Sequence, residues 1–340
     1  MTMHMKYVSF ALGMLVSVCV IAHAGETTLT VGKPNTDCPN AEYTTIAAAV
    51  IAAAPGDIIE ICPALYPEQL VISKPLTLRG VRDNVAGNEV NRVLLQPCVE
   101  ILPGNGFGVL VDSDKPGPFY VAVENNSIHD FTKDGVQAIN AGVTAKVEGN
   151  RIAGVGPSIA FQFGVFIANG AVGLINGNII TEGPCGSLSP ANCLNARSEG
   201  VTLKSFGDGT VVSHNVITHA QSGIFINGGN DARISDNFIS DIDSLDGIDI
   251  QGTASGFFTN SRIDNNTIFN VTPLANEGCG VFEYSGTGIA GNTISRTTVN
   301  DAYCGVGFVT ADHSETGDYH NTLFTSVNTD TFSYPPPTEP

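Results

Sequence analysis

Asn150-Arg-Ile152, Asn178-Ile-Ile180 and Asn215-Val-Ile217 repeat one short pattern, an asparagine followed by a variable and then an aliphatic residue. The full set of these units is Asn126-Ser-Ile128, Asn150-Arg-Ile152, Asn178-Ile-Ile180, Asn215-Val-Ile217, Asn237-Phe-Ile239, Asn266-Thr-Ile268, Asn292-Thr-Ile294 and Asn321-Thr-Leu323. A second unit, a glycine followed by valine or isoleucine, alternates with the first at Gly135, Gly164, Gly200, Gly223, Gly247, Gly280 and Gly305. The arc from glycine to asparagine is nearly constant in length, whereas the return arc absorbs insertions.

A repeat of about 22–30 residues, with two short β-rich segments and no helical periodicity, favours a coil of stacked strands. One rung cannot bury its apolar face alone, so neighbouring rungs stack about 4.8 Å apart and share a core. We expect the asparagines at one corner to form a ladder of side-chain hydrogen bonds and the glycines to permit a tight corner. The leucine-rich pattern L-x-x-L-x-L is missing, and a β-propeller needs longer periods.

The chain resembles the right-handed parallel β-helix proteins of the pectate-lyase-like superfamily over residues about 36–325. Its N-terminal part, Tyr43-Thr-Thr-Ile46 followed by Ala-rich residues 47–54 and Ile58-Ile-Glu-Ile61, looks like the opening of many exported β-helix proteins. The resemblance implies an amphipathic helix at about 42–54 that caps the coil, with Ile46, Val50 and Ile51 facing the core. An uncapped terminal rung would expose apolar core and an unpaired strand edge.

The predicted fold class is therefore all-β, a right-handed single-stranded parallel β-helix with an N-terminal amphipathic cap helix. The predicted domain covers residues 25–325, and the Pro-rich segment 326–340 lacks periodicity and is expected to be a flexible tail.

The N-terminus is typical of a signal peptide removed after residue 24. Lys6 precedes an apolar stretch, and Ala22-His23-Ala24 is an A-x-A cleavage site. A lipoprotein anchored through Cys19 is the alternative, but the bulky Val18 precedes that cysteine where a small residue is expected. We expect a periplasmic or secreted protein with no transmembrane segment, because no later stretch has the roughly 20 apolar residues that spanning requires.

The charge balance narrows the classes of partner. Thirty-three acidic residues against 15 basic ones give a formal net charge of −18 in a chain of 340 residues. Nucleic acid is an unsuitable partner for such a chain, because binding phosphates requires an excess of Lys and Arg. A polyanionic substrate would also be repelled unless calcium or a local basic patch intervened.

Seven cysteines remain after cleavage, and their positions predict three disulfides. Cys279 and Cys304 each immediately precede a repeat glycine and should stack on adjacent rungs, within the Cα separation that a disulfide allows. Cys185 and Cys193 lie together in the longest insertion, and Cys38 with Cys62 would tie the segment before the cap helix to the first strand. Cys98 is left over, and no C-x-x-C pair suggests zinc.

The resemblance implies that ligands bind along the outer face of the coil, across several rungs. Strand alternation predicts two outward columns after the repeat glycines. The first column is Gln137, Phe166, Thr202, Phe225, Asp249, Phe282 and Gly307, and the second is Ile139, Ala168, Lys204, Asn227, Gln251, Tyr284 and Val309. Sugar rings stack on aromatic groups while their hydroxyls take polar partners. The predicted substrate-binding residues are Asn227, Gln251, Phe166, Phe225, Phe282 and Tyr284, and the alternative is an ordinary solvated sheet face.

Three residues are candidates for catalysis. Asp249 lies between Ile248 and Ile250 and is expected to point outward into solvent, where it could bind a cation or act as acid or base. Lys204 lies two rungs back and could neutralise developing negative charge. His219 is matched on the next rung by Asp241, and a His beside a carboxylate could transfer protons. Each of these residues could instead be an ordinary surface residue.

Asp241, Asp243 and Asp246 form a compact acidic cluster that could hold calcium, the single cofactor that the sequence suggests. The cluster lacks the glycine and terminal glutamate of an EF-hand loop, and a solvated turn is the alternative. The catalytic signatures of the superfamily's enzymes do not carry over to this chain. We therefore expect an exported protein that binds a polysaccharide along its outer groove, with two roles open: processing of a lyase, epimerase or hydrolase type, or a non-catalytic surface, structural or adhesion role.

Overall fold

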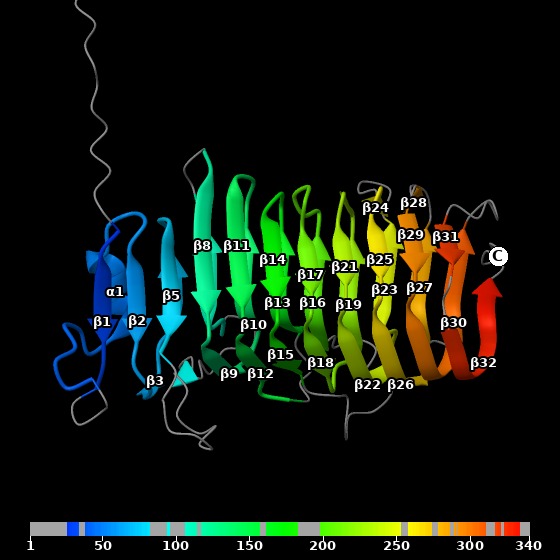
Figure 1. Ribbon diagram of the computed structural model, residues 1–340, viewed down its shortest axis with the longest axis horizontal. Coiled ribbons are helices and arrows are strands. Elements are labelled where there is room, and N and C mark those ends of the chain that lie inside the picture. Colours follow the sequence, from blue (N-terminus) through cyan, green and yellow to red (C-terminus); the bar gives the residue numbers. More distant parts are fainter. Residues whose placement is uncertain are drawn as a thin grey trace, which may run out of the picture.

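The computed structural model shows a coil of short strands whose rungs follow one another along the long axis of the molecule (Figure 1). All strand pairings that join the rungs are parallel, which confirms the predicted right-handed parallel β-helix. Among the residues described, no helix is both long and apolar enough to cross a membrane. The structure describes residues 26–33, 38–81, 94–95, 106–113, 117–156, 161–182, 198–252, 258–273, 278–285, 289–290, 292–310, 317–320 and 323–333.

Each complete rung contributes one strand to each of three columns, here called sheets I, II and III. Sheet I has eleven strands, which run across the molecule in Figure 1 from β1 to β31. They are β1 (Thr28–Val31), β2 (Ile58–Ile61), β5 (Leu76–Gly80), β8 (Phe119–Glu124), β11 (Val143–Glu148), β14 (Val172–Asn176), β17 (Val211–Ser213), β21 (Arg233–Ser235), β25 (Arg262–Asp264), β29 (Asn292–Ser295) and β31 (Gly317–His320).

Sheets II and III are joined by the long strands of the last rungs, β30 (Thr298–Thr310) and β32 (Leu323–Ser333), which pair across both columns. Sheet II contains β4 (Leu70–Ile72), β7 (Val109–Asp112), β10 (Asp134–Ile139), β13 (Gln162–Ala168), β16 (Ser198–Lys204), β19 (Ser222–Asn227), β23 (Ile248–Gly252) and β27 (Cys279–Ser285). Sheet III contains β3 (Leu65–Tyr66), β6 (Leu94–Leu95), β9 (Ser127–Phe131), β12 (Arg151–Gly154), β15 (Ile179–Thr181), β18 (Val216–Thr218), β22 (Phe238–Ser244) and β26 (Thr267–Pro273). A separate three-stranded sheet, outside sheets I to III, pairs β20 (Gly229–Asn230), β24 (Phe258–Thr259) and β28 (Ile289–Ala290). β32 continues past residue 325, so the last strand extends into the segment predicted to be a flexible tail.

Helix α1 (Ile46–Ala52) lies beside β1 and β2 at the N-terminal end of the coil (Figure 1). Its first turn is held by the carboxylate of Glu68, which accepts hydrogen bonds from the backbone N–H groups of Ile46 and Ala47. Such a carboxylate stabilises the free N–H groups that every helix N-terminus carries. Ile46 and Val50 are buried as predicted, whereas Ile51 is 80% exposed and the prediction for it is wrong.

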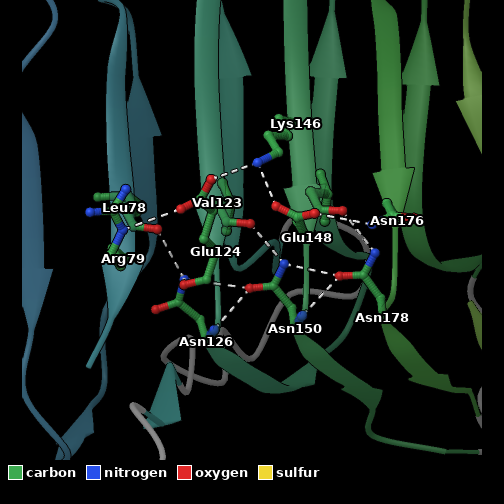
Figure 2. A network of polar contacts seen from close by, with 11 residues as sticks. Leu78, Arg79, Val123, Glu124, Asn126, Lys146, Glu148, Asn150, Asn176 and Asn178 are labelled. Carbon is green, nitrogen blue, oxygen red and sulfur yellow. Dashed lines mark hydrogen bonds and ion pairs between the residues drawn. The ribbon is translucent and has the colours of Figure 1, made fainter. Parts of the chain in front are cut away.

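The asparagine ladder is confirmed, and its first members appear in Figure 2. The backbone N–H of each asparagine donates to the side-chain oxygen of the asparagine on the next rung, for example from Asn150 to Asn178 at 2.9 Å. The side-chain amide donates back to a carbonyl of the preceding rung, as from Asn178 to Val147 at 2.8 Å. The ladder runs through Asn126, Asn150, Asn178, Asn215, Asn237 and Asn266. These buried amides satisfy the backbone groups that a sharp corner would leave without partners.

The residue before each ladder position has a left-handed backbone, with φ between 51° and 65° from Asn125 to Arg296. Asn, Asp and Gly adopt this region most readily, which explains why they occupy most of these positions. In the rung after Asn266 the ladder position is held by Thr297, because the backbone of Thr298 pairs with Asn266 there. Asn292 instead begins β29 of sheet I, so its assignment to the repeat is wrong.

The repeat glycines are required for close packing rather than for an unusual φ. A Cβ on Gly200 would lie 2.3 Å from the Cγ2 atom of Ile217, the aliphatic residue of the asparagine unit in the same rung. It would also lie 2.7 Å from the carbonyl oxygen of Gly223, the repeat glycine of the next rung. Contacts this short cannot accommodate a side chain, so the two repeat units of the sequence constrain one another through packing.

Two of the three predicted disulfides are present in the structure. Cys279 and Cys304 are direct partners in the register of β27 and β30, with their Cα atoms 4.4 Å apart. Cys38 and Cys62 are joined with a Cα separation of 6.2 Å. The predicted pair Cys185–Cys193 and the spare Cys98 lie outside the described residues.

Candidate site on the outer face of sheet II

The strand register confirms the stacking order predicted for the two outward columns. Phe166, Thr202, Phe225, Asp249 and Phe282 are successive partners on the strands from β13 to β27. The residues that alternate with them, including Val201, Ile224 and Ile248, are buried in the core. The first column therefore belongs to the outer side of sheet II.

Asp249 is only 2% exposed, so the expectation that it points into solvent is wrong. Its Oδ2 atom accepts a hydrogen bond of 3.2 Å from Nε2 of Gln251, a predicted substrate-binding residue. Thr202 and Phe225 in the same column are also buried. Strand alternation determines the side of the sheet on which a side chain lies, but it does not determine whether other parts of the chain cover that side.

The second column brings three predicted polar residues together on adjacent rungs. Lys204 pairs with Asn227, and Asn227 pairs with Gln251. Lys204 is exposed, while Asn227 and Gln251 are half-buried. Tyr284 continues the column in register, and its side chain lies outside the described part of the structure. An ammonium group and two amides thus follow one another along the coil axis.

A row of phenylalanine rings on β13 and the residue before it is a feature that the sequence analysis missed. The ring of Phe163 stacks on that of Phe166 with centroids 5.3 Å apart and an angle of 20° between the planes. Phe161 lies 6.2 Å from Phe163 and is 51% exposed. On the next rung, in register with Phe163 and Phe166, the carboxylate of Glu199 accepts a hydrogen bond from the hydroxyl of Thr202. The spacing of three phenylalanines around Gly164 was the available signal.

His219 lies at the corner between β18 and β19, where its φ is 56°. Asp241 occupies the matching corner on the next rung, also with a left-handed backbone. The carboxylate oxygens of Asp241 accept hydrogen bonds from Ser240 and Asn270. Asp241 therefore helps to link rungs, and a catalytic role for His219 stays a prediction.

The predicted calcium cluster also takes part in the packing of the coil. Oδ1 of Asp246 accepts hydrogen bonds from the backbone N–H groups of Gly278 and Cys279 on the next rung, at 3.2 and 2.6 Å. Asp243 is half-buried. Within the described ranges, no group of three or more His, Cys, Asp or Glu side chains is arranged to hold a metal ion. Calcium at Asp241, Asp243 and Asp246 stays a prediction.

Comparison with known proteins agrees with this architecture. A family model described as the right-handed β-helix region matches residues 192–331. The crystal structure of pectate lyase Pel9A aligns with 90% of this chain and with 79% of its own chain, at 13% sequence identity and a TM-score of 0.50. The catalytic domain of a GH87 α-1,3-glucanase covers 83% of this chain over 58% of its own, with 14% identity and a TM-score of 0.49. An alginate lyase from Paenibacillus sp. covers 89% of this chain over 99% of its own, with 14% identity and a TM-score of 0.42. No curated protein matches in sequence. The chain therefore has the fold of a right-handed parallel β-helix, which it shares with pectate lyase Pel9A.

Proposed function

We propose that the protein binds a polysaccharide along the outer face of sheet II. The observation that carries this proposal is the stacked pair Phe163–Phe166, which lies one rung from the exposed Lys204. Aromatic rings supply the apolar surface on which a sugar ring stacks, and polar side chains supply partners for its hydroxyls. Lys204 and Gln251 lie two rungs apart, about 10 Å along the axis, so a saccharide chain would meet polar groups in succession.

An uncharged polysaccharide fits the charge of the chain better than a polyanion. The formal net charge of −18 repels anionic chains, and Lys204 is the one basic residue in the two outward columns. The chain shares its fold with pectate lyase Pel9A, and this shared fold is the only support that the comparison gives for a saccharide as the ligand class. We further propose that the protein is exported after removal of residues 1–24, since disulfides persist in oxidising compartments and two are present.

Processing of the bound saccharide is a second candidate function, favoured by the buried Asp249. Its carboxylate is held by Gln251 within the same outer columns as Lys204. A carboxylate positioned in this way could act as a general acid or base while Lys204 neutralises negative charge on the substrate. A non-catalytic surface, structural or adhesion role is the alternative.

Binding to a glycan array tests the proposal, followed by reducing-end and unsaturated-product assays on each saccharide that binds. Phe166→Ala should weaken binding about 5–30-fold, which corresponds to 1–2 kcal/mol for a lost ring contact. Phe238→Ala is the matched control, because Phe238 is an exposed phenylalanine on sheet III. Equal affinities of the two variants would contradict the proposed site. Product formation that Asp249→Asn abolishes would establish processing, whereas binding without products would favour the non-catalytic role.

A further inference from the structure

Three polar side chains are buried together at the corner where sheet III leads into sheet II. Asp134 is the first residue of β10, Gln162 is the first residue of β13, and Glu182 directly follows β15. Their exposed fractions are 0%, 1% and 2%. Asp134 is the register partner of Phe163 but is itself fully buried, and we call the three residues the corner cluster.

Two glycines provide the space in which the corner cluster converges. Nε2 of Gln162 donates to the carbonyl oxygen of Phe131 at 3.0 Å, which fixes the orientation of the amide. A Cβ on Gly154 would lie 2.2 Å from Oε1 of Gln162 and 2.5 Å from Oε2 of Glu182. A Cβ on Gly164 would lie 2.9 Å from Oε1 of Glu182. The amide oxygen and the carboxylate thus meet over the bare Cα of Gly154.

The corner cluster contains five buried oxygen atoms that accept no hydrogen bond from any described residue. They are both carboxylate oxygens of Asp134, both of Glu182, and Oε1 of Gln162. Buried polar atoms nearly always have a partner, and each one without a partner costs roughly 1–3 kcal/mol. An amide oxygen and a carboxylate oxygen that face one another repel unless a positive charge or a proton lies between them.

The charges around the corner cluster do not compensate for its carboxylates. Burial raises the pKa of Asp134 to about 7, although the positive charge of Lys133 acts in the opposite direction. Burial also raises the pKa of Glu182 well above its ordinary value, and the negative charge of Asp134 adds to that rise. Two buried carboxylates repel one another when both are ionised, and a positive charge between them would offset that repulsion.

We propose that the corner cluster binds one calcium ion. Calcium is a hard cation that takes six to eight oxygen ligands in flexible geometry, and carboxylate and amide oxygens are among its usual ligands. Two carboxylates balance its charge, and Oε1 of Gln162 adds a neutral ligand. The ion would join the paired strands β10 and β13 to the end of β15, so its role is structural. Protonation of the two carboxyl groups is the competing explanation.

Calcium titration of the full-length protein after chelator treatment tests this site by calorimetry and thermal unfolding. We expect one calcium ion per chain, a melting temperature that rises with calcium concentration, and tighter binding at pH 8 than at pH 6, since the carboxyl groups must lose protons. Glu182→Gln should weaken binding at least tenfold and abolish the thermal response. If Glu182→Gln does not fold, Asp134→Asn provides the same readout. Asp208→Asn removes an exposed carboxylate between β16 and β17 and should behave like the wild type.

Three results would overturn the proposal. The first is that the wild-type protein does not bind calcium between pH 6 and 8 and is less stable at pH 8 than Glu182→Gln. That result is the one expected if the carboxyl groups are protonated. The second is unchanged calcium affinity in both Glu182→Gln and Asp134→Asn. The third is loss of binding in Asp243→Asn alone, which would place the ion at the acidic cluster of sheet III.

Discussion

Asn178→Ala should destabilise the coil by several kcal/mol, because the buried side chain of Asn178 joins its rung to the preceding one (Figure 2). Its side-chain oxygen accepts the backbone N–H of Asn150, and its amide donates to the carbonyl of Val147. The substitution leaves that N–H and that carbonyl buried without these partners. At about 1–3 kcal/mol for each group, the expected loss is about 2–6 kcal/mol in the free energy of unfolding.

Urea unfolding followed by circular dichroism measures this loss, and Asn176→Ala is the matched control. Asn176 lies two residues earlier on the outer side of sheet I, is half-buried, and exchanges hydrogen bonds with Glu148 and Ser213. Its loss should cost only about 1 kcal/mol, because the groups it leaves without a partner are less buried than those at the ladder. Equal midpoints for the two variants would refute the reasoning that the buried ladder stabilises the corner.

Three further predictions concern stability. Glu283 points into the core and burial raises its pKa to about 7, so the wild type should lose stability as pH rises from about 4 to 7. In urea unfolding, Glu283→Gln should be more stable than the wild type at pH 8 by on the order of 3 kcal/mol and nearly equal to it at pH 4. Burial raises the pKa of Asp264, but hydrogen bonds from Arg296 and Ser295 outweigh this and hold the pKa below its ordinary value. The resulting stabilisation is present above pH 4 and is lost below it, so Arg296→Ala should reduce the loss of stability on acidification. An unchanged loss of stability below pH 4 would contradict this. Cys304→Ser opens the bond to Cys279, whose sequence separation is 25, and should lower the free energy of unfolding by about 3 kcal/mol, an effect that a reducing agent should reproduce in the wild type.

The coil and its register could be predicted from the sequence because each rung repeats the same physical requirements. A buried amide at Asn178 and a bare Cα at Gly200 are required at fixed places in every rung, so the same residue types recur at those places. The pairing of Cys279 with Cys304 followed from the same register. Asn292 was misplaced because a threonine can hold the ladder corner, and residue type alone could not distinguish a corner asparagine from one on a strand.

The candidate site could be predicted only in part. Strand alternation correctly placed Asp249 on the outer side of sheet II, but alternation alone does not determine how far a side chain on that side is exposed. The corner cluster was missed because Glu182 lies just beyond the repeat unit Asn178-Ile-Ile180, at a position that the repeat does not define. Its convergence with Gln162 over Gly154 is visible only in the folded structure. The phenylalanine row could not be found from the predicted columns, because both columns begin after the repeat glycine and Phe163 precedes Gly164.

A crystal structure of the protein with an oligosaccharide chosen from the glycan array would test the central claim most directly. We predict a sugar ring against the face of Phe163 or Phe166, with its hydroxyls within hydrogen-bond distance of Lys204 or Asn227. An oligosaccharide bound instead to another face, such as the one that exposes Phe238 on sheet III, would contradict the assignment of the site to the outer face of sheet II.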